Sequence, residues 1–336
     1  MLRFFAILFP LLLCTAALAD DGRLMVTEEN DKFASLDDRH YTQGILSSWL
    51  PGDLAPDSKW NALFDSLSAN TPAFGGGDFK RQYDWEVLGQ SIFTPQAIHT
   101  PNPPPTDRPY GAWLYTGASL LQQTKQDTYD TLENTEVLAG VVGPLALGGV
   151  VQNDFHQFIG VQPAQGWRNQ IHNEPGLAAS YERKWRFALP VSDYFSADAI
   201  PEAGATVGNV FTYGEAGGMV RFGHNIAADY GPYHIRPSLS GTGWFDQDAL
   251  QRKLGWYFFL GTQGRAVGHN IFLDGNTWRS SDSVDKKPLV ADFIGGASVF
   301  WSRAARLDFT VTERTKEFYG QVAPDRFGSV SLVVGF

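Results

Sequence analysis

The fold class is decided by the last stretch of the chain, Phe327-Gly328-Ser329-Val330-Ser331-Leu332-Val333-Val334-Gly335-Phe336. Every second residue from Val330 to Phe336 is large and apolar, whereas the residues between them are mostly small or polar. This period of two is typical of a strand whose two faces meet different surroundings. The segment is therefore a strand of a membrane barrel or, as the alternative, the final buried strand of a soluble sandwich.

Similar alternation recurs along the whole chain, in segments separated by Gly, Pro, Asp and Asn. We expect strands near residues 23–31, 39–50, 81–94, 109–124, 131–142, 174–189, 192–206, 215–226, 252–267, 289–302, 304–315 and 326–336. Repeated segments of this length are the signature of a transmembrane barrel. The sequence thus predicts an all-β fold, a transmembrane antiparallel β-barrel of about twelve strands.

The C-terminal aromatic residue also indicates the cellular location of the protein. An alternating last strand that ends on Phe336 resembles the signal by which outer-membrane barrels are recognised for assembly. We therefore expect the barrel assembly machinery to be a partner through the C-terminal strand. The protein is predicted to be integral to the bacterial outer membrane.

The first residues have the pattern of a cleaved signal peptide. Arg3 precedes an apolar run, and Ala17-Leu18-Ala19 precedes Asp20. We expect residues 1–19 to be the signal peptide and residues 20–336 to form a single barrel domain. A lipoprotein that uses Cys14 is the alternative, but Leu13 is bulkier than the residue such sites need. Since Cys14 is the one cysteine, the mature chain has no thiol for a disulfide.

Composition excludes one class of partner and favours the barrel. The chain has 35 Gly, 14% aromatic and 18% charged residues, with a net charge of −10. A nucleic-acid partner is excluded because its binding needs basic patches. Aromatic residues near the ends of the expected strands predict an interfacial girdle: Trp113, Tyr115, Trp185, Trp256, Tyr257, Phe258, Phe259, Phe300 and Trp301.

Two interruptions of the alternation predict long loops. Residues 51–78 hold several prolines and glycines around a short helix near Trp60–Phe64, and residues 95–109 are rich in proline. Long loops of a membrane barrel usually lie on the external side and often cover a site. Both segments are therefore candidate substrate-facing elements.

Three polar segments carry the candidate chemistry: Glu28–Phe33, Asp37–Gly44 and the stretch Gly148–Gly160 around His156. Acidic and amide oxygens near Asp31 suit a hard cation such as Ca²⁺, with a solvated turn as the alternative. His156 has amides and aromatic rings beside it, so it is a candidate general base as well as a candidate structural residue. Asn30 and Thr42 could orient water or a carbonyl group, with a role as turn residues as the alternative.

The sequence lacks the usual arrangements for nucleophilic hydrolysis. It contains no Gly-x-Ser-x-Gly elbow and no His-Glu-x-x-His helix. No histidine is followed two places later by serine, which counts against an outer-membrane phospholipase of the His-x-Ser kind. If the protein is a hydrolase, water is the expected nucleophile.

Several long motifs, in the same order, resemble the lipid A 3′-O-deacylase family of Gram-negative outer membranes. They are Glu29-Asn30-Asp31 with Phe33, Tyr41-Thr42-Gln43-Gly44, Asp107–Tyr115, Val151–His156 with Ile159-Gly160, Gly166–Gln170, Asn270–Asn276 and Thr315–Phe318. The resemblance covers nearly the whole mature chain. It implies a twelve-stranded barrel that hydrolyses the 3′-linked acyloxyacyl ester of lipid A in a Ca²⁺-dependent reaction.

The resemblance also implies roles for individual residues. His156 would be the general base that activates water, with Asn30, Asp31 and Thr42 beside it as further catalytic residues. Asp31 would be the metal ligand, and the cation would polarise the ester carbonyl. The expected partner is lipid A, or whole lipopolysaccharide, in the outer leaflet.

Three positions depart from the family's pattern. Two acidic positions near the histidine are Val150 and Gln162 here, and the lysine expected after Ser91–Pro95 is replaced by His99, Thr100 and prolines. The missing acids bear on Ca²⁺ binding, and the missing lysine bears on recognition of a phosphate. Two other hypotheses therefore stay open: a non-catalytic porin-like or structural barrel, and a related phospholipase or esterase.

Overall fold

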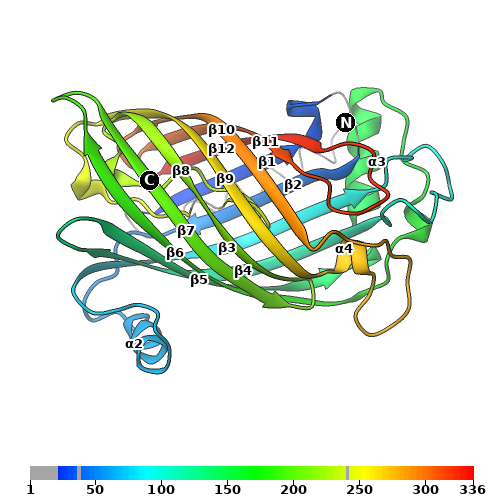
Figure 1. The fold of residues 1–336 in the computed structure, drawn as a ribbon, viewed down its shortest axis with the longest axis horizontal. Helices are drawn as coiled ribbons and strands as arrows, with labels where there is room; N and C mark the ends of the chain where they lie inside the picture. The colour runs from blue at the N-terminus through cyan, green and yellow to red at the C-terminus, as the bar shows by residue number, and fades with distance from the viewer. Residues whose placement is uncertain (1–21, 36–38, 240–241) are drawn as a thin grey trace.

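All twelve predicted strands form, and together they make one closed antiparallel barrel (Figure 1). The computed structural model describes residues 22–35, 39–239 and 242–336, so the expected signal peptide lies outside the described residues. The strands are β1 (Arg23–Asn30), β2 (His40–Leu50), β3 (Asp78–Thr94), β4 (Gly111–Lys125), β5 (Asp130–Val142), β6 (Glu174–Pro190), β7 (Ser196–Gly208), β8 (Phe211–His224), β9 (Leu254–Asn270), β10 (Leu289–Trp301), β11 (Ala305–Arg314) and β12 (Asp325–Gly335).

Each strand pairs with its sequence neighbours, and β1 also pairs with β12 to close the wall. The α-helices are α2 (Asn61–Asn70), α3 (Gly148–Ile159) and α4 (Ile271–Asp274). None of these helices, among the described residues, has the length and apolar character needed to cross a membrane.

Strand β12 has the two faces that its alternation predicts. Phe327 and Val333 are buried, whereas Leu332 and Val334 are 48% and 42% exposed. Other strands likewise present large apolar side chains on the outside of the wall, among them Val137, Leu177, Val207, Val220, Leu260, Phe293 and Phe309. Polar side chains lie on the inside. This arrangement matches a barrel surrounded by lipid.

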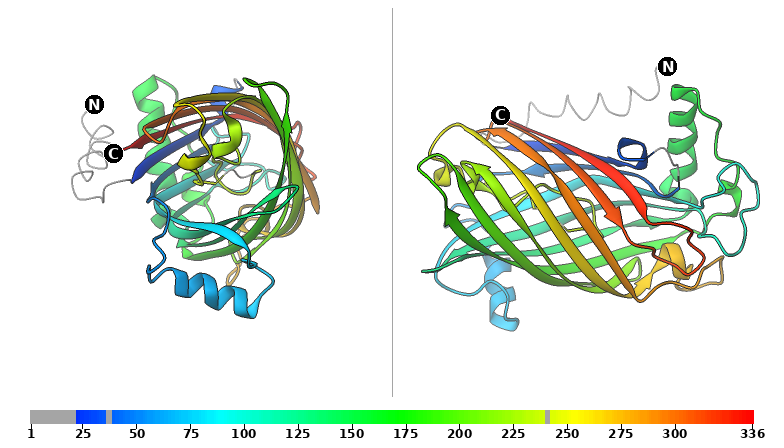
Figure 2. Two further views of the ribbon diagram at one scale, coloured as in Figure 1. Left: turned by 90° about the vertical axis from the view of Figure 1, so that its left-hand side faces the viewer. Right: turned by 45° about the horizontal axis from the view of Figure 1, so that its top comes forward.

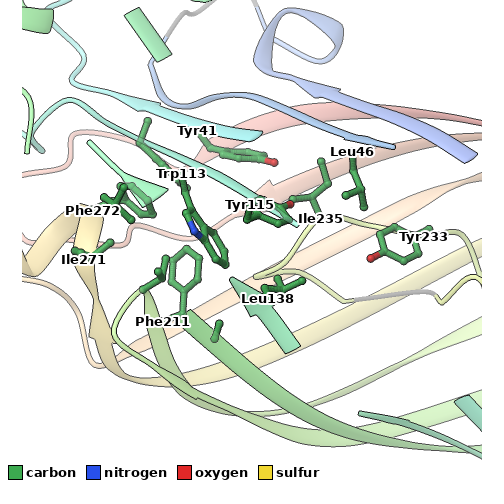
Figure 3. Close-up of a cluster of buried hydrophobic side chains, with 14 of the residues drawn as sticks. Tyr41, Leu46, Trp113, Tyr115, Leu138, Phe211, Tyr233, Ile235, Ile271 and Phe272 are labelled. Atoms are coloured by element: carbon green, nitrogen blue, oxygen red, sulfur yellow. The ribbon is translucent and has the colours of Figure 1, made fainter. Parts of the chain in front are cut away.

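The predicted aromatic girdle is only partly present, because alternation sends neighbouring rings to opposite sides of the wall. Phe258 and Trp301 are more than half exposed. The prediction is wrong for the residues that are buried instead: Trp113, Tyr115, Tyr257, Phe259 and Phe300. Trp113 and Tyr115 lie in the interior cluster that Figure 3 shows, together with Phe211 and Phe272.

The interior of the barrel is filled by the connection between β8 and β9, of which the structure describes residues 225–239 and 242–253. Arg236 of this connection contacts carboxylates on three strands: Glu136, Glu182 and Glu215. Arg23 of β1 donates to the carbonyl of Gly243. A segment that contacts strands around the whole wall must lie inside it, and Figure 2 shows it within the ring of strands.

The two long loops predicted from the sequence lie at opposite ends of the barrel. Residues 51–77 follow Leu50, which pairs with Arg23, so this loop is at the end where β1 begins and β12 finishes. It holds α2, close to the expected helix. Residues 95–110 and α3 lie at the other end, called the loop end below (Figure 1). The prediction that both loops face the same side is therefore wrong.

Candidate functional site

His156 lies in helix α3, although the surrounding sequence suggests strands. The helix starts after Leu147, which has a left-handed backbone conformation (φ 60°), and stops at Gly160 (φ 75°). Glycine tolerates this conformation without steric cost and commonly ends helices. The helix therefore has defined limits at both ends.

One face of α3 is buried. Its buried residues are Gly148, Gln152 and His156, spaced four apart. This spacing places their side chains in one row along the helix. Trp167 donates from its indole nitrogen to Oε1 of Gln152 at 2.7 Å. The row thus carries an amide and an imidazole on the side that faces the protein.

Helix α3 lies against the outside of the barrel wall, over β3 and β4. A Cβ atom added to Gly148 would come within 2.5 Å of the Cβ of Ala112, so only glycine allows this approach. Gln90 of β3 donates to the carbonyl of Ala146 at 2.6 Å. Ile92, Ala112, Ala146 and Trp167 belong to one buried apolar cluster. These contacts hold the start of α3 on the outer wall.

A backbone carbonyl sets the tautomer of His156. Nδ1 of the buried ring lies 3.0 Å from the carbonyl oxygen of Gln162. A carbonyl can only accept, so Nδ1 carries the proton of the neutral ring and Nε2 carries the lone pair. This is the tautomer in which Nε2 can take a proton from water.

The outer wall near the loop end is polar, where a lipid-facing wall would be apolar. Glu28 accepts from Gln43 at 2.9 Å, and the hydroxyl oxygens of Thr42 and Thr94 lie 2.7 Å apart. A bulge between Tyr41 and Gln43 turns Thr42 and Gln43 to the same side. We call Glu28, Asn30, Thr42, Gln43, Gln90 and Thr94 the polar wall.

The predicted residues Asn30, Asp31 and Thr42 come together at the loop end of β1 and β2. Asn30 pairs with Gln43, the neighbour of Thr42. Asp31 begins the short 3-10 helix η2 (Asp31–Phe33), and the backbone amide of Arg39 donates to its Oδ2 at 2.9 Å. Asn30 caps η2 by accepting from the amide of Lys32. All three residues are buried, with 5% or less of their surface exposed.

The side-chain oxygen atoms of Asn30, Asp31 and Thr42 are of the types that bind a hard cation. Carboxylate, amide carbonyl and hydroxyl oxygens are Ca²⁺ ligands, and no sulfur or imidazole is needed. Asp31 supplies the carboxylate, and Asn30 and Thr42 supply neutral oxygens. Among the described residues, the three acids with ligand atoms close together are Asp53, Asp246 and Asp248, which lie at the opposite end. Lys80 contacts Asp246 and Asp248.

Figures 1 and 2 place α3 beside η2 at the loop end in different orientations of the molecule. The helix that carries His156 and the strand ends that carry Asn30, Asp31 and Thr42 are thus neighbours.

The sequence analysis assigned no role in the site to three residues that build its surroundings: Gln90, Thr94 and Trp167. Gln90 and Thr94 point outward from a strand, where apolar residues are expected. Polar side chains at outward positions of a predicted strand are the signal that could have found them.

The profile of the family described as outer membrane protein LpxR matches residues 4–336. The chain belongs to this family. LpxR from Salmonella typhimurium has the same fold, with a TM-score of 0.71 and 22% sequence identity over 94% of this chain and 100% of that chain.

Two other solved barrels are less similar. The β domain of the Bordetella autotransporter BrkA gives a TM-score of 0.46 at 9% identity, covering 95% of this chain and 100% of that chain. The translocator domain of NalP from Neisseria meningitidis gives 0.38 at 7% identity, covering 99% of this chain and 95% of that chain. A comparison with curated proteins gives no match.

The structure clarifies the two positions at which this member of the LpxR family lacks an expected acid. Val150 is 58% exposed and lies two residues from Gly148, on the opposite side of α3 from the buried row. The side chain of Gln162 is also exposed, while its backbone carbonyl accepts from His156. Neither side chain is directed at the buried face of α3.

Proposed function

We propose that this outer-membrane barrel is an esterase that removes the 3′-linked acyloxyacyl group from lipid A, with His156 as the general base. The observation that carries the proposal is the burial of His156 on the face of α3 that lies against the outer wall. Its Nδ1–H is held by the carbonyl of Gln162, and the neighbouring wall is polar. Family membership and the motifs around Asn30, Thr42 and His156 support the same reaction.

In the proposed reaction, Nε2 of His156 takes a proton from water as the water oxygen attacks the ester carbonyl carbon. The resulting tetrahedral oxyanion collapses, and the bond between the carbonyl carbon and the sugar oxygen breaks. The protonated His156 returns its proton to that oxygen. The products are the released acyloxyacyl acid and lipid A with a free 3′-hydroxyl group.

The buried oxygens around His156 orient the reactants. Asn30 and Thr42 offer an amide and a hydroxyl that can hold water or the ester carbonyl. Asp31, with Asn30 and Thr42, would hold Ca²⁺, which when bound polarises the carbonyl and stabilises negative charge on its oxygen. This role for the cation is a proposal that rests on the oxygen-rich donor set.

The lipid A mass spectrum of cells that produce the protein tests this function. Intact protein and the Gln157→Ala control, altered at an exposed position of α3, should both give lipid A lighter by one acyloxyacyl group. His156→Ala should leave lipid A unchanged. The proposal fails if intact protein and His156→Ala give the same spectrum with Ca²⁺ supplied and both barrels folded.

The remaining hypotheses give different results in the same cells. A phospholipase would release lysophospholipid and fatty acid without changing lipid A. A porin-like barrel would change neither lipid, and the filling of the lumen by the connection between β8 and β9 argues against an open pore.

Calcium binding is tested apart from turnover. Calorimetric titration of Ca²⁺ into the intact protein in detergent should give a binding signal that weakens in Asp31→Asn. An equal signal in the two proteins would remove Asp31 from the metal site while leaving the role of His156 intact.

A further inference from the structure

The side of α3 that faces away from the barrel exposes the large apolar residues Val150 and Phe158 beside the polar residues Asp154 and Gln157. The exposed large residues on the helix and its two flanks are Leu145, Leu147, Val150, Phe158, Ile159 and Val161, which are between 37% and 61% exposed. We call them the outer α3 surface. Exposed apolar groups gathered on one element mark an interaction site, since water is a poor environment for them.

The charge of this segment limits the kinds of partner. From Pro144 to Pro163, Asp154 is the one charged residue in the sequence, with His156 counted as neutral. Neither lysine nor arginine is present to attract an acidic protein or an anionic surface. The outer α3 surface therefore suits a partner that it contacts through apolar groups.

The outer α3 surface continues the lipid-facing surface of the barrel. Leu177, which is 53% exposed on the outside of β6, pairs with Ala139 of β5. Strand β5 ends three residues later at Val142, a rise of about 10 Å at the usual rise per strand residue. The chain then passes through Leu145 and Leu147 into α3 without leaving the outside of the wall.

The direction of α3 fits a position within the plane of the membrane. In Figure 2 the helix runs across the direction of the strands, at the loop end. At the opposite end, three of the connections are the short turns 126–129, 191–195 and 302–304. Short turns face the periplasm in outer-membrane barrels, so the loop end faces outward.

We propose that the outer α3 surface is seated among the acyl chains of the outer leaflet, at their boundary with the head groups. Helix α3 is then an interfacial helix, with lipid against Val150 and Phe158 and with the polar wall on the side of His156. The occupant is the hydrocarbon of the leaflet. This inference concerns lipid contact alone and does not depend on hydrolysis.

The chain allows a direct test because its one cysteine, Cys14, lies in the expected signal peptide. Phe158→Cys and Val150→Cys are labelled with an environment-sensitive fluorophore and reconstituted in phosphatidylcholine vesicles. Some vesicles carry a nitroxide on the acyl chain. Leu332→Cys on the outside of β12 is the lipid-facing control, and Asp282→Cys in the exposed connection before β10 is the aqueous control.

The expected result is blue-shifted emission at positions 158 and 150, with nitroxide quenching comparable to that of Leu332→Cys. Quenching no greater than that of Asp282→Cys would overturn the proposal. An emission shift that grows with protein concentration, without nitroxide quenching, would also overturn it, because a second copy would then cover the surface. Heat-dependent gel mobility shows that each labelled barrel is folded, and lipid A analysis is not required.

Discussion

The inward and outward sides of β1 and β2 are both polar and buried at the loop end, but their contacts differ. Inward, Glu29 accepts from the hydroxyl of Tyr41 at 2.8 Å and from the amide of Ile235 at 3.1 Å. Outward, Asn30 caps η2, and Thr42 lies 2.7 Å from Thr94. The consecutive residues Glu29 and Asn30 thus make contacts on opposite sides of the same wall.

This difference separates polar residues that hold the barrel from polar residues that are candidates for chemistry. The inward groups bind the connection between β8 and β9 through charges and backbone amides, and Arg236 contacts three carboxylates at once. The outward groups contact amides and hydroxyls beside the helix of His156. Burial alone would not distinguish the two sets, because both are almost fully covered.

Replacing one histidine on each side should give the largest contrast. His156→Ala should lower kcat for ester release by about 10²–10⁴-fold, the usual contribution of a general base. Its inward counterpart is His234, which lies 3.4 Å from Glu29 and 3.4 Å from Thr310. His234→Ala should lower the unfolding temperature and keep kcat within a few-fold. Turnover by purified barrels in detergent micelles measures both effects. Equal losses of kcat would contradict the proposed difference between structural inward residues and catalytic outward residues.

Removing the charge of Arg236 inside the barrel should reduce stability more than activity. Arg236→Met leaves Glu136, Glu182 and Glu215 without this partner, so the free energy of unfolding should fall by about 3–5 kcal/mol. Denaturant titration in detergent measures the change.

The matched control for Arg236 is Arg326→Met. Arg326 pairs with Glu313 at 2.6 Å but is 61% exposed, so the cost should be below about 1 kcal/mol. If the two variants lose the same stability, the buried ion pairs of Arg236 do not stabilise the connection between β8 and β9.

The smallest expected effect concerns the hydroxyl pair on the polar wall. Thr42→Val removes a hydrogen bond worth about 0.5–1.5 kcal/mol, so kcat should fall by up to about ten-fold if Thr42 holds a reactant. Thr94→Val breaks the same contact and leaves the Thr42 hydroxyl in place. A smaller loss of kcat in Thr94→Val would assign the direct role to Thr42, whereas identical losses would mean that the pair only shapes the wall.

The strands were predictable because alternation reflects the two environments of a barrel wall. The same regularity explains the girdle error: Tyr257 points inward and Phe258 outward, although both are aromatic residues near a strand end. Hydrophobicity alone does not state which of two neighbouring rings meets lipid. The pairing of strands was needed to decide it.

The filling of the lumen was not predictable, because its contacts join residues far apart in sequence. Arg236 meets Glu136, which lies 100 residues earlier, and Ile235 meets Glu29, which lies 206 residues earlier. Neither contact can be predicted from the local alternation of apolar and polar residues.

The candidate site was predicted in part. In the structure Asn30 and Thr42 lie at the ends of adjacent strands, and Asp31 follows Asn30 directly in η2. Helix α3 was missed because two glycines and two valines at its start favour other conformations. The four-residue spacing of Gly148, Gln152 and His156 was the available helical signal. The catalytic and metal roles stay predictions.

The hydrogen bond between His156 and residue 162 has a consequence for how the sequence can vary. The acceptor is a main-chain carbonyl, which every amino acid at position 162 would supply. Since the side chain there is exposed, an acidic, amide or apolar residue could replace it while the imidazole keeps the same tautomer. Evolutionary drift at position 162 is thus compatible with an unchanged base, and the shape of the chain from Gly160 to Ala164 is the property under constraint.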